Sequence, residues 1–406
     1  MKRILSMCMA MILVCGCFSG CSWLGEESSS SSVPAVSETT SPSSTVSAAP
    51  ASPTPEPTPV PTPTPTATPS PTPEPLDYMA SGGNLELPVS GATGYASVNL
   101  TVRETPGKEG NALEVIAPGT AFQILSEEGE WWQVKTEAVT GWVAHAYCFI
   151  NLPDVIPSIV YNCSNASASL FVSRGKSIPN ITGEKLYDAF GYNERLEEEE
   201  YIVPVLYAMA KKICAAQQAA LDAGNTLVIY EGFRPYEVQL KVASNLEALA
   251  EQDAEVYEGI TTSPWSIGWF IAQDVSNHQK GYAIDVSLAS VEETEHRVAG
   301  EYGYTRVTSY TEYEMPTAMH ELSAAAASLS VPVSSQSRTA WQEVAAASSM
   351  NEAALLLRGY CTDAGLTPLA SEWWHFNDLD AAEIANQTVN DGNYYLQTVC
   401  SAAPAG

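Results

Sequence analysis

The sequence predicts a chain in three parts: a disordered N-terminal part, a small all-β barrel, and a larger domain in which helices and strands mix. More than half of the 27 prolines lie between residues 34 and 75. Short patterns of period two follow from residue 97 to 150, and longer mixed patterns run from about 155 to 400. The 406 residues also exceed the roughly 250 to 300 over which one core usually grows, so two or three domains are expected.

The charge balance argues against two classes of partner. Lys and Arg number 18 against 47 Asp and Glu, which gives a formal net charge of -29. Nucleic-acid binding depends on neutralising phosphates with Lys and Arg, and no basic stripe is visible in the sequence. An anionic lipid surface would repel such a chain as well. We therefore expect neither nucleic-acid binding nor simple electrostatic adhesion to a membrane.

Residues 1–21 have the pattern of a secretory signal peptide. A basic Lys-Arg pair precedes an apolar run over residues 4–18, which is shorter than the about 20 residues that span a bilayer. The run ends in Phe-Ser-Gly before Cys21, which resembles the lipobox of bacterial lipoproteins. This resemblance implies lipidation of Cys21 and anchoring to the outer face of the cell membrane. Cys17 is a competing site, and an ordinary cleaved signal is the alternative.

Residues 22–91 are predicted to form a disordered linker rich in Ser, Thr and Pro. Between residues 26 and 75 there is no aromatic residue, Lys or Arg, so the segment cannot bury enough apolar area to offset its ordering entropy. Thr-Pro repeats over residues 53–75 favour polyproline II, a semi-rigid spacer that rises about 3.1 Å per residue. Such a spacer would hold the folded part away from the membrane, in or near a cell wall.

Five cysteines lie beyond the signal region: Cys148, Cys163, Cys214, Cys361 and Cys400. An odd number cannot pair completely within the chain, and no CxxC spacing indicates a thiolate metal site. Cys214 lies on a helical pattern and is predicted to be a small buried residue. The pattern leaves disulfide pairing open.

Residues 92–152 are predicted to form the small all-β module, because short strand patterns alternate with turn residues. Three stretches stand out: Leu100-Thr101-Val102-Arg103, Trp131-Trp132-Gln133-Val134 and Gly141-Trp142-Val143. Together they resemble the bacterial SH3 domain, which implies binding to peptidoglycan or its peptides. The alternative is that the tryptophans only fill a core. His145 is expected to be a surface or packing residue.

Residues 153–406 are predicted to form the larger domain. Helical patterns over 204–222 and 236–251 flank a short apolar run at 226–230, which is typical of a buried strand. We interpret the acidic run 197–200 as the solvated start of the first helix, where negative charge meets the favourable end of the helix dipole.

A second strand over residues 282–288 contains Asp285 among apolar residues. A carboxylate there costs several kcal/mol to desolvate unless it is paired or bound to a metal. His278 lies seven residues upstream, and His375 lies far downstream with Glu372 three residues before it. Two imidazoles and a carboxylate are a common ligand set for catalytic zinc, and a nearby Glu that is not a ligand can accept a proton from water. A lone histidine, however, is more often a core or surface residue.

Three motifs strengthen this hypothesis: Gly232-Phe233-Arg234-Pro235, Ser276-x-His278-x-x-Gly281-x-Ala283-x-Asp285 and Glu372-Trp373-Trp374-His375-Phe376. In this order they resemble the arginine segment and the two zinc motifs of the D-alanyl-D-alanine metallopeptidases. The resemblance implies an α+β fold in which an antiparallel sheet carries the zinc site. It also implies hydrolysis of the D-Ala-D-Ala peptide bond.

The resemblance assigns one zinc ion to three ligands: His278, Asp285 and His375. It gives Glu372 the general acid/base role and Arg234 the contacts to substrate and transition state. Ser276 is a looser candidate for holding the substrate. His296 and His320 fall outside the motifs, and we interpret them as structural or surface residues.

We predict the dipeptidase branch of this family, and a carboxypeptidase is the alternative. The paired Trp373-Trp374 and the segment 180–183 favour a D-alanyl-D-alanine dipeptidase similar to the vancomycin-resistance enzymes, although Ile181 and residues 314–317 depart from that pattern. Export and tethering instead favour a carboxypeptidase that trims peptidoglycan stem peptides. An inactive wall-binding lipoprotein is the alternative from another class, and the presence of every motif residue argues against it.

Overall fold

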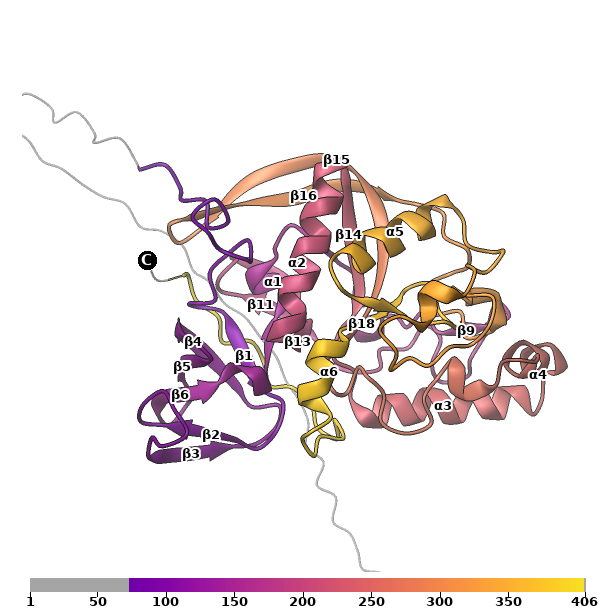
Figure 1. The fold of residues 1–406 in the computed structure, drawn as a ribbon, viewed down its shortest axis with the longest axis horizontal. Coiled ribbons are helices and arrows are strands. Elements are labelled where there is room, and N and C mark those ends of the chain that lie inside the picture. Colours follow the sequence, from indigo (N-terminus) through magenta and orange to yellow (C-terminus); the bar gives the residue numbers. More distant parts are fainter. Residues whose placement is uncertain (1–72, 405–406) are drawn as a thin grey trace, which may run out of the picture. The chain divides into compact units, whose positions relative to one another are not determined.

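The computed structural model describes residues 73–404 (Figure 1). The predicted signal peptide, the lipidation site Cys21 with its competitor Cys17, and most of the linker lie outside the described residues. Within them, no helix combines the length and the apolar character needed to cross a bilayer.

The end of the predicted linker is packed against the folded part. Leu85, Leu87 and Val89 are buried. The sequence predicts them to lie in the linker because Pro, Ser and Thr dominate the preceding residues. The apolar side chains at every second position from 85 to 89 are buried in the core.

The first sheet contains the predicted β module. Its strands are β1 (Thr93–Ala96), β2 (Leu100–Arg103), β3 (Ala112–Ile116), β4 (Ala121–Glu128), β5 (Trp131–Lys135), β6 (Thr140–Ala144), β7 (Cys148–Asn151) and β13 (Pro204–Leu206). They lie in the order β13-β7-β1-β4-β5-β6-β2-β3, and neighbours are antiparallel. The all-β prediction is confirmed for this region. Closure into a barrel is not shown, since the pairings among the described strands leave β3 and β13 as the two ends.

The tryptophans of the module differ in burial. Trp132 is fully buried in the core, while Trp131 and Trp142 are half-buried. His145 packs at an angle against the rings of Trp132 and Tyr207, which confirms the prediction of a packing or surface residue.

The second sheet lies mostly within residues 153–406, the part of the chain predicted to form the larger domain. Its strands are β8 (Val160–Tyr161), β14 (Asn225–Glu231), β15 (Ala283–Ala299), β16 (Tyr302–Glu312), β17 (Thr367–Pro368) and β18 (His375–Asn377). The order is β17-β18-β15-β14-β8, with β16 paired to the outer part of β15. Every pairing is antiparallel except that of β8 with β14. The predicted α+β class with an antiparallel sheet is therefore confirmed.

The helices are α1 (Leu152–Val155), α2 (Tyr207–Asp222), α3 (Tyr236–Ala250), α4 (Ala254–Thr261), α5 (Glu352–Asp363) and α6 (Leu379–Ala385). In Figure 1, α2 and α5 lie on the same side of β14 and β15. Two small hairpins complete the fold: β9 (Val172–Ser173) with β10 (Lys176–Ser177), and β11 (Phe190–Asn193) with β12 (Glu198–Tyr201).

Two local predictions differ from the structure. The first helix begins at Tyr207, because residues 204–206 form β13 and pair with β7 of the module. The interpretation of the acidic run as a helix start is wrong, because Glu198 and Glu200 lie in β12. Their carboxylates pair with Arg306 on β16, which explains negative charge in a strand.

The described cysteines are free thiols, and the prediction for Cys214 is confirmed. Cys214 is buried on α2, as are Cys148, Cys163 and Cys361 at their own positions, while Cys400 is exposed. Burial raises the pKa of Cys214 to about 12, so this thiol stays protonated and acts as a small apolar group.

Candidate metal centre

Strand pairing brings the three predicted ligands together. Asp285 near the start of β15 is the register partner of His375, the first residue of β18. His278 lies in the loop before β15, and Gly281 takes a φ of +74° in that loop, a conformation that glycine adopts without strain. The fold therefore converges three side chains that are distant in sequence.

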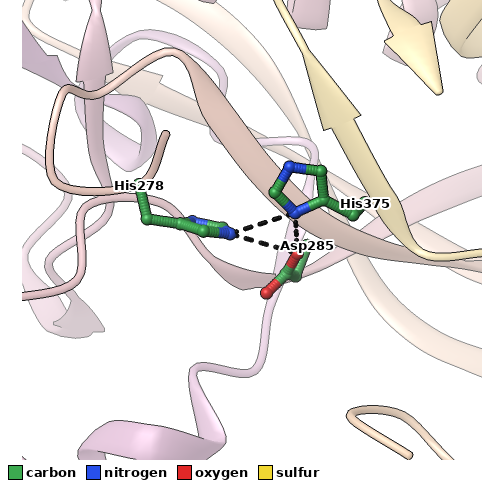
Figure 2. Close-up of side chains that lie close together, drawn as sticks. All are labelled: His278, Asp285 and His375. Carbon is green, nitrogen blue, oxygen red and sulfur yellow. Dashed lines mark hydrogen bonds and ion pairs between the residues drawn. The ribbon is translucent and has the colours of Figure 1, made fainter. Parts of the chain in front are cut away.

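The facing atoms of these side chains lie close to one another (Figure 2). His375 Nδ1 is 3.0 Å and His278 Nε2 is 3.3 Å from Asp285 Oδ1. The two ring nitrogens are 3.2 Å apart, and all three ligand atoms lie within 4.8 Å of one another. All three residues are buried.

Hydrogen bonds on the far sides of both rings fix which nitrogen is free. His278 Nδ1 is 2.7 Å from the carbonyl oxygen of Gly232, and a carbonyl only accepts, so Nδ1 carries the proton. His375 Nε2 is 3.0 Å from Asn377 Oδ1, and that amide oxygen also accepts from Asn277 Nδ2 at 2.8 Å. The unprotonated nitrogens, His278 Nε2 and His375 Nδ1, therefore face Asp285.

Three lone-pair donors that face one another require a cation between them. Two neutral imidazole nitrogens at 3.2 Å repel unless a proton or a metal ion lies between them. Two histidines and one carboxylate with outer hydrogen bonds to oxygen acceptors fit the donor set of catalytic zinc. The residues present therefore fit the zinc ion that the sequence implies.

The pKa shifts of the three ligand residues show which of them is charged in the folded protein. Burial lowers the pKa of His278. Burial alone would raise the pKa of Asp285 and lower that of His375, but the surrounding histidines hold the Asp285 pKa well below its usual range, and Asp285 raises the pKa of His375. Asp285 is thus ionised inside the protein, as a metal ligand must be.

Arg234 follows β14 and points into the same cleft. Its Nε forms an ion pair with Glu231 at 2.7 Å, its Nη1 donates to Gln239 Oε1 at 3.0 Å, and its Nη2 lies 3.5 Å from Asp285 Oδ2. Burial opposes the charge, but Glu231 and Asp285 outweigh it and raise the pKa of Arg234. The guanidinium is held charged and in one orientation.

A second group of possible metal ligands consists of Glu231, Asp285 and His320. Arg234 already pairs with Glu231 and approaches Asp285 Oδ2. A divalent ion among the three would lie beside a fixed positive charge, which costs free energy in a buried site. We therefore assign the metal to the first group only.

Glu372 lies just before β18, beside the three ligand atoms. Its Oε2 is 3.7 Å from His375 Nδ1. Burial, with a smaller contribution from the negative charge of Asp285, raises the pKa of Glu372 to about 8. Since a bound cation lowers the pKa of a neighbouring acid, zinc would favour the carboxylate form at neutral pH.

A cleft of about 340 Å³ contains these groups. Its polar lining includes Arg234, Ser276 and Glu372, and its apolar walls include Phe171, Trp269, Phe270, Leu322 and Trp374. Ser276 Oγ is buried and has no hydrogen-bond partner among the described residues, so it is available to a ligand. The volume is in the range of pockets that hold small ligands.

The structure brings the predicted metal-ligating, catalytic and substrate-contacting residues to this one cleft, and it places His320 against Asp285 outside the cleft lining. Sequence reasoning interpreted His320 as structural or surface; it is fully buried and its Nε2 lies 3.1 Å from Asp285 Oδ2. No periodicity or motif marks this histidine, so only the fold reveals the contact. His296 is exposed on the outer part of β15.

Of the described residues that favour a dipeptidase, Trp374 alone lines the cleft. Neither residues 180–183 nor residues 314–317 line it. Trp373 is buried and donates from Nε1 to Thr317 Oγ1 at 2.9 Å, and only Trp374 of the pair reaches the lining. These features shape the support of the site more than its substrate pocket.

The first sheet holds both loops of the site. Leu206 N of β13 donates to Gly281 O at 2.8 Å, and Phe233 N donates to Pro204 O at 3.0 Å. Phe149 of β7 packs on Phe233, with ring centroids 5.6 Å apart. Phe149 also lies so close to Gly281 that a Cβ at position 281 would overlap the Phe149 ring. The β module is therefore part of the frame that positions His278 and Arg234.

Comparison with known protein families gives a match within the predicted β module. Residues 98–148 match the bacterial SH3 domain family. These residues form a bacterial SH3 domain. The SH3 resemblance predicted from the three sequence stretches is thus confirmed, and the half-buried Trp131 and Trp142 belong to this domain.

No curated protein matches the chain. Among solved structures, VanYB in complex with D-alanine-D-alanine is 14% identical with a TM-score of 0.23, covering 54% of this chain and 91% of its own. A glutamate-to-alanine mutant of the vancomycin-resistance D,D-pentapeptidase VanY in complex with Zn(II) is 15% identical with a TM-score of 0.22, covering 54% and 93%. Similarity at these TM-scores carries no weight for function, which must be argued from the motifs and the geometry.

Proposed function

We propose that this chain is a zinc-dependent D-alanyl-D-alanine peptidase of the bacterial cell wall. The observation that carries the proposal is the convergence of His278 Nε2, Asp285 Oδ1 and His375 Nδ1 within 4.8 Å, with Glu372 and Arg234 in the same cleft. These five residues are the ones that the motifs assign.

His278, Asp285 and His375 would hold the zinc ion. When bound, zinc supplies Lewis-acid polarisation of a carbonyl and lowers the pKa of water toward 7. The hydrogen bonds from the histidines to Gly232 O and Asn377 Oδ1 keep their free nitrogens directed at the ion.

Glu372 would accept a proton from the attacking water and then deliver it to the leaving amine. It lies beside the ligands without being part of their close group, as a general base must. Arg234 would stabilise the oxyanion or hold the C-terminal carboxylate of the substrate, because its charge and orientation are fixed before the substrate binds. Ser276 would donate to the same substrate, since its buried Oγ has no hydrogen-bond partner among the described residues.

Charge in the cleft favours a carboxypeptidase that removes D-alanine from stem peptides. A free dipeptide carries an ammonium group close to the scissile carbonyl, and burying that charge requires a carboxylate partner. The carboxylates among the described lining residues are Asp285 and Glu372. Asp285 already faces His278, His320 and His375, and Glu372 is needed for the chemistry.

The dipeptidase remains the second candidate, favoured by the paired tryptophans and the 180–183 segment. Lipid anchoring at Cys21 and the SH3 domain fit better with a substrate in the wall. Binding of wall peptides by the SH3 domain is part of this proposal.

Product analysis tests the proposal. The purified protein, loaded with zinc, is incubated with free D-Ala-D-Ala and with a stem pentapeptide that ends in D-Ala-D-Ala, and products are identified by mass spectrometry. We expect D-alanine from the pentapeptide and little from the dipeptide. Cleavage of the dipeptide alone would establish the dipeptidase. Cleavage of neither, with binding of peptidoglycan retained, would establish the inactive wall-binding lipoprotein.

A further inference from the structure

His320 contacts the proposed metal centre from outside the ligand group. Its Nε2 lies 3.1 Å from Asp285 Oδ2, whereas His278 and His375 face Oδ1 of the same carboxylate. A carboxylate bound to a metal has no proton to donate, so in this contact His320 Nε2 is the donor and Asp285 Oδ2 the acceptor. The two oxygens of Asp285 therefore have different partners.

The His320 ring is held in place by packing. It is fully buried and stacks on Phe171, with ring centroids 4.4 Å apart and an interplanar angle of 21°. Trp374 approaches it edge-on at 6.0 Å. The backbone oxygen of His320 accepts from Val172 N at 3.2 Å, which ties its segment to β9. A ring held in this way directs its donor at one oxygen.

The hydrogen bond determines which oxygen of Asp285 can serve as a ligand. Oδ2 accepts from His320 and lies 3.5 Å from Nη2 of Arg234, so both of its neighbours are donors. Oδ1 is left to face the free nitrogens of His278 and His375. Without the His320 bond, Oδ2 would keep only the longer contact to Arg234, and the carboxylate would be free to rotate about its Cβ–Cγ bond.

We propose that His320 is a positioning residue that fixes Asp285 as a ligand through Oδ1 and thereby increases zinc affinity. It acts through Asp285 and is not itself a ligand, because its donor nitrogen faces Oδ2. Hydrogen-bonding partners of metal ligands typically contribute 10- to 100-fold in metal affinity. The inference rests on the proposed function, since it presupposes that zinc binds at this centre.

Two substitutions separate the hydrogen bond from the histidine itself. In His320→Gln, the amide nitrogen takes about the place of Nε2 and can still donate to Asp285. In His320→Asn, the amide is shorter and falls near the place of Nδ1, so the donation is lost. The backbone φ of +61° at this position suits Asn at least as well as His, so the Asn variant is expected to fold. His296→Gln, on the exposed outer part of β15, is the matched control.

The measurement is the zinc dissociation constant, obtained by competition with a chromophoric chelator, alongside thermal unfolding of the zinc-free proteins. We expect about 10- to 100-fold weaker zinc binding in His320→Asn, with His320→Gln and His296→Gln within about threefold of the wild type. Wild-type affinity in a folded Asn variant would overturn the inference and leave the proposed function intact. Equal losses in the Gln and Asn variants would also overturn it, because the donor would then be irrelevant. A wild type that binds no zinc would overturn both.

Discussion

The two sheets of the molecule bury different kinds of side chain. The SH3-domain sheet encloses an apolar interior in which Val102, Trp132 and Val134 are fully buried. The sheet of the larger domain instead buries charged and ionisable groups where β14, β15 and β18 meet, among them Glu231 and Asp285. A buried charge is costly unless it is paired or bound to a metal, whereas burial of apolar groups stabilises the fold directly. The difference indicates that the first sheet supplies support and the second supplies chemistry.

The two sheets are nevertheless connected. β13 extends the SH3-domain sheet, and its backbone bonds to Gly281 and Phe233 reach both loops of the proposed centre. The support is therefore specific, because it sets the positions of His278 and Arg234. Substitutions in each sheet should have separable effects, and the following predictions use that separation.

Glu372→Gln should have the largest effect on activity. The amide cannot accept a proton from water, so kcat should fall by about 10²- to 10⁴-fold. Zinc content should stay at the wild-type level, because Glu372 lies outside the ligand group. Steady-state kinetics and metal analysis of the same sample check both parts. A variant with kcat within a few-fold of the wild type would remove the general base from the mechanism.

Arg234→Lys should have the next largest effect. Lysine keeps the charge but loses the fork that reaches Glu231, Gln239 and Asp285 together, so kcat/KM should fall by about 10²- to 10³-fold. Arg338→Lys is the control, since Arg338 pairs with Asp380 on an exposed surface. Kinetics with the stem pentapeptide measure the change, and equal, small effects of both substitutions would contradict the role of Arg234.

Phe149→Ala tests whether the SH3-domain sheet positions the centre. Phe149 packs on Phe233 and lies against Gly281, so its loss should lower kcat several-fold in addition to destabilising the fold by about 3–5 kcal/mol. Phe122→Ala removes a ring that is equally buried but packs on Gly94 within the module. It should cost similar stability without the loss of kcat. Denaturant unfolding measures the stability of both variants, and steady-state kinetics measure their kcat. Equal kcat values in Phe149→Ala and Phe122→Ala would show that Phe149 does not position the centre specifically.

The smallest expected effect concerns Glu86 and the pH dependence of stability. It contrasts two buried carboxylates, Asp285 and Glu86. Asp285 is surrounded by histidines and stays ionised, while burial of Glu86 raises its pKa from 4.5 to about 7 despite hydrogen bonds from Ser158 and Gln218. Between pH 4.5 and 7 the folded state thus holds a proton that the unfolded state has lost. The free energy of unfolding should fall as pH rises through this range, by about 3 kcal/mol from this group.

Glu86→Gln should remove that part of the pH dependence. In the wild type, Oε2 accepts from Ser158 N, and Oε1 accepts from Ser158 Oγ and Gln218 Nε2. In the variant, the amide oxygen can accept from Ser158 N in the place of Oε2, and the amide nitrogen can donate to the hydroxyl oxygen of Ser158 or, once the Gln218 amide turns over, to Gln218 Oε1. Urea unfolding of the wild type and the variant at pH 5 and pH 8 measures the difference. We expect the variant to gain stability relative to the wild type at pH 8. If the free energy of unfolding changes between pH 5 and pH 8 by the same amount in both proteins, Glu86 does not have a raised pKa in the folded state.

Local sequence patterns predicted the strands and helix around the site, because these elements depend mainly on residues that are close together in the sequence. The buried strand at 226–230, the strand around Asp285 and the helix over 236–251 follow from periodicity and turn residues, and the structure confirms them as β14, β15 and α3. The convergence of the ligands could be expected only from the family motifs, because the β15–β18 pairing joins residues 90 positions apart.

Other features depend on tertiary contacts that no local pattern reveals. Residues 204–206 continue a helical pattern, yet β7 captures them as a strand. Most of the acidic run lies in strand β12, where Arg297 pairs with Glu198 and Arg306 pairs with Glu200 from across the fold. His320 has no motif around it, and its contact with Asp285 exists only once β9 and β15 are placed.

The most direct test of the central claim is anomalous diffraction at the zinc edge from crystals of the purified protein. We expect one strong peak per chain, bonded to His278 Nε2, Asp285 Oδ1 and His375 Nδ1. The same experiment on His375→Ala should give no peak at this position. A peak elsewhere in the wild type, or none in crystals grown with zinc, would contradict the account.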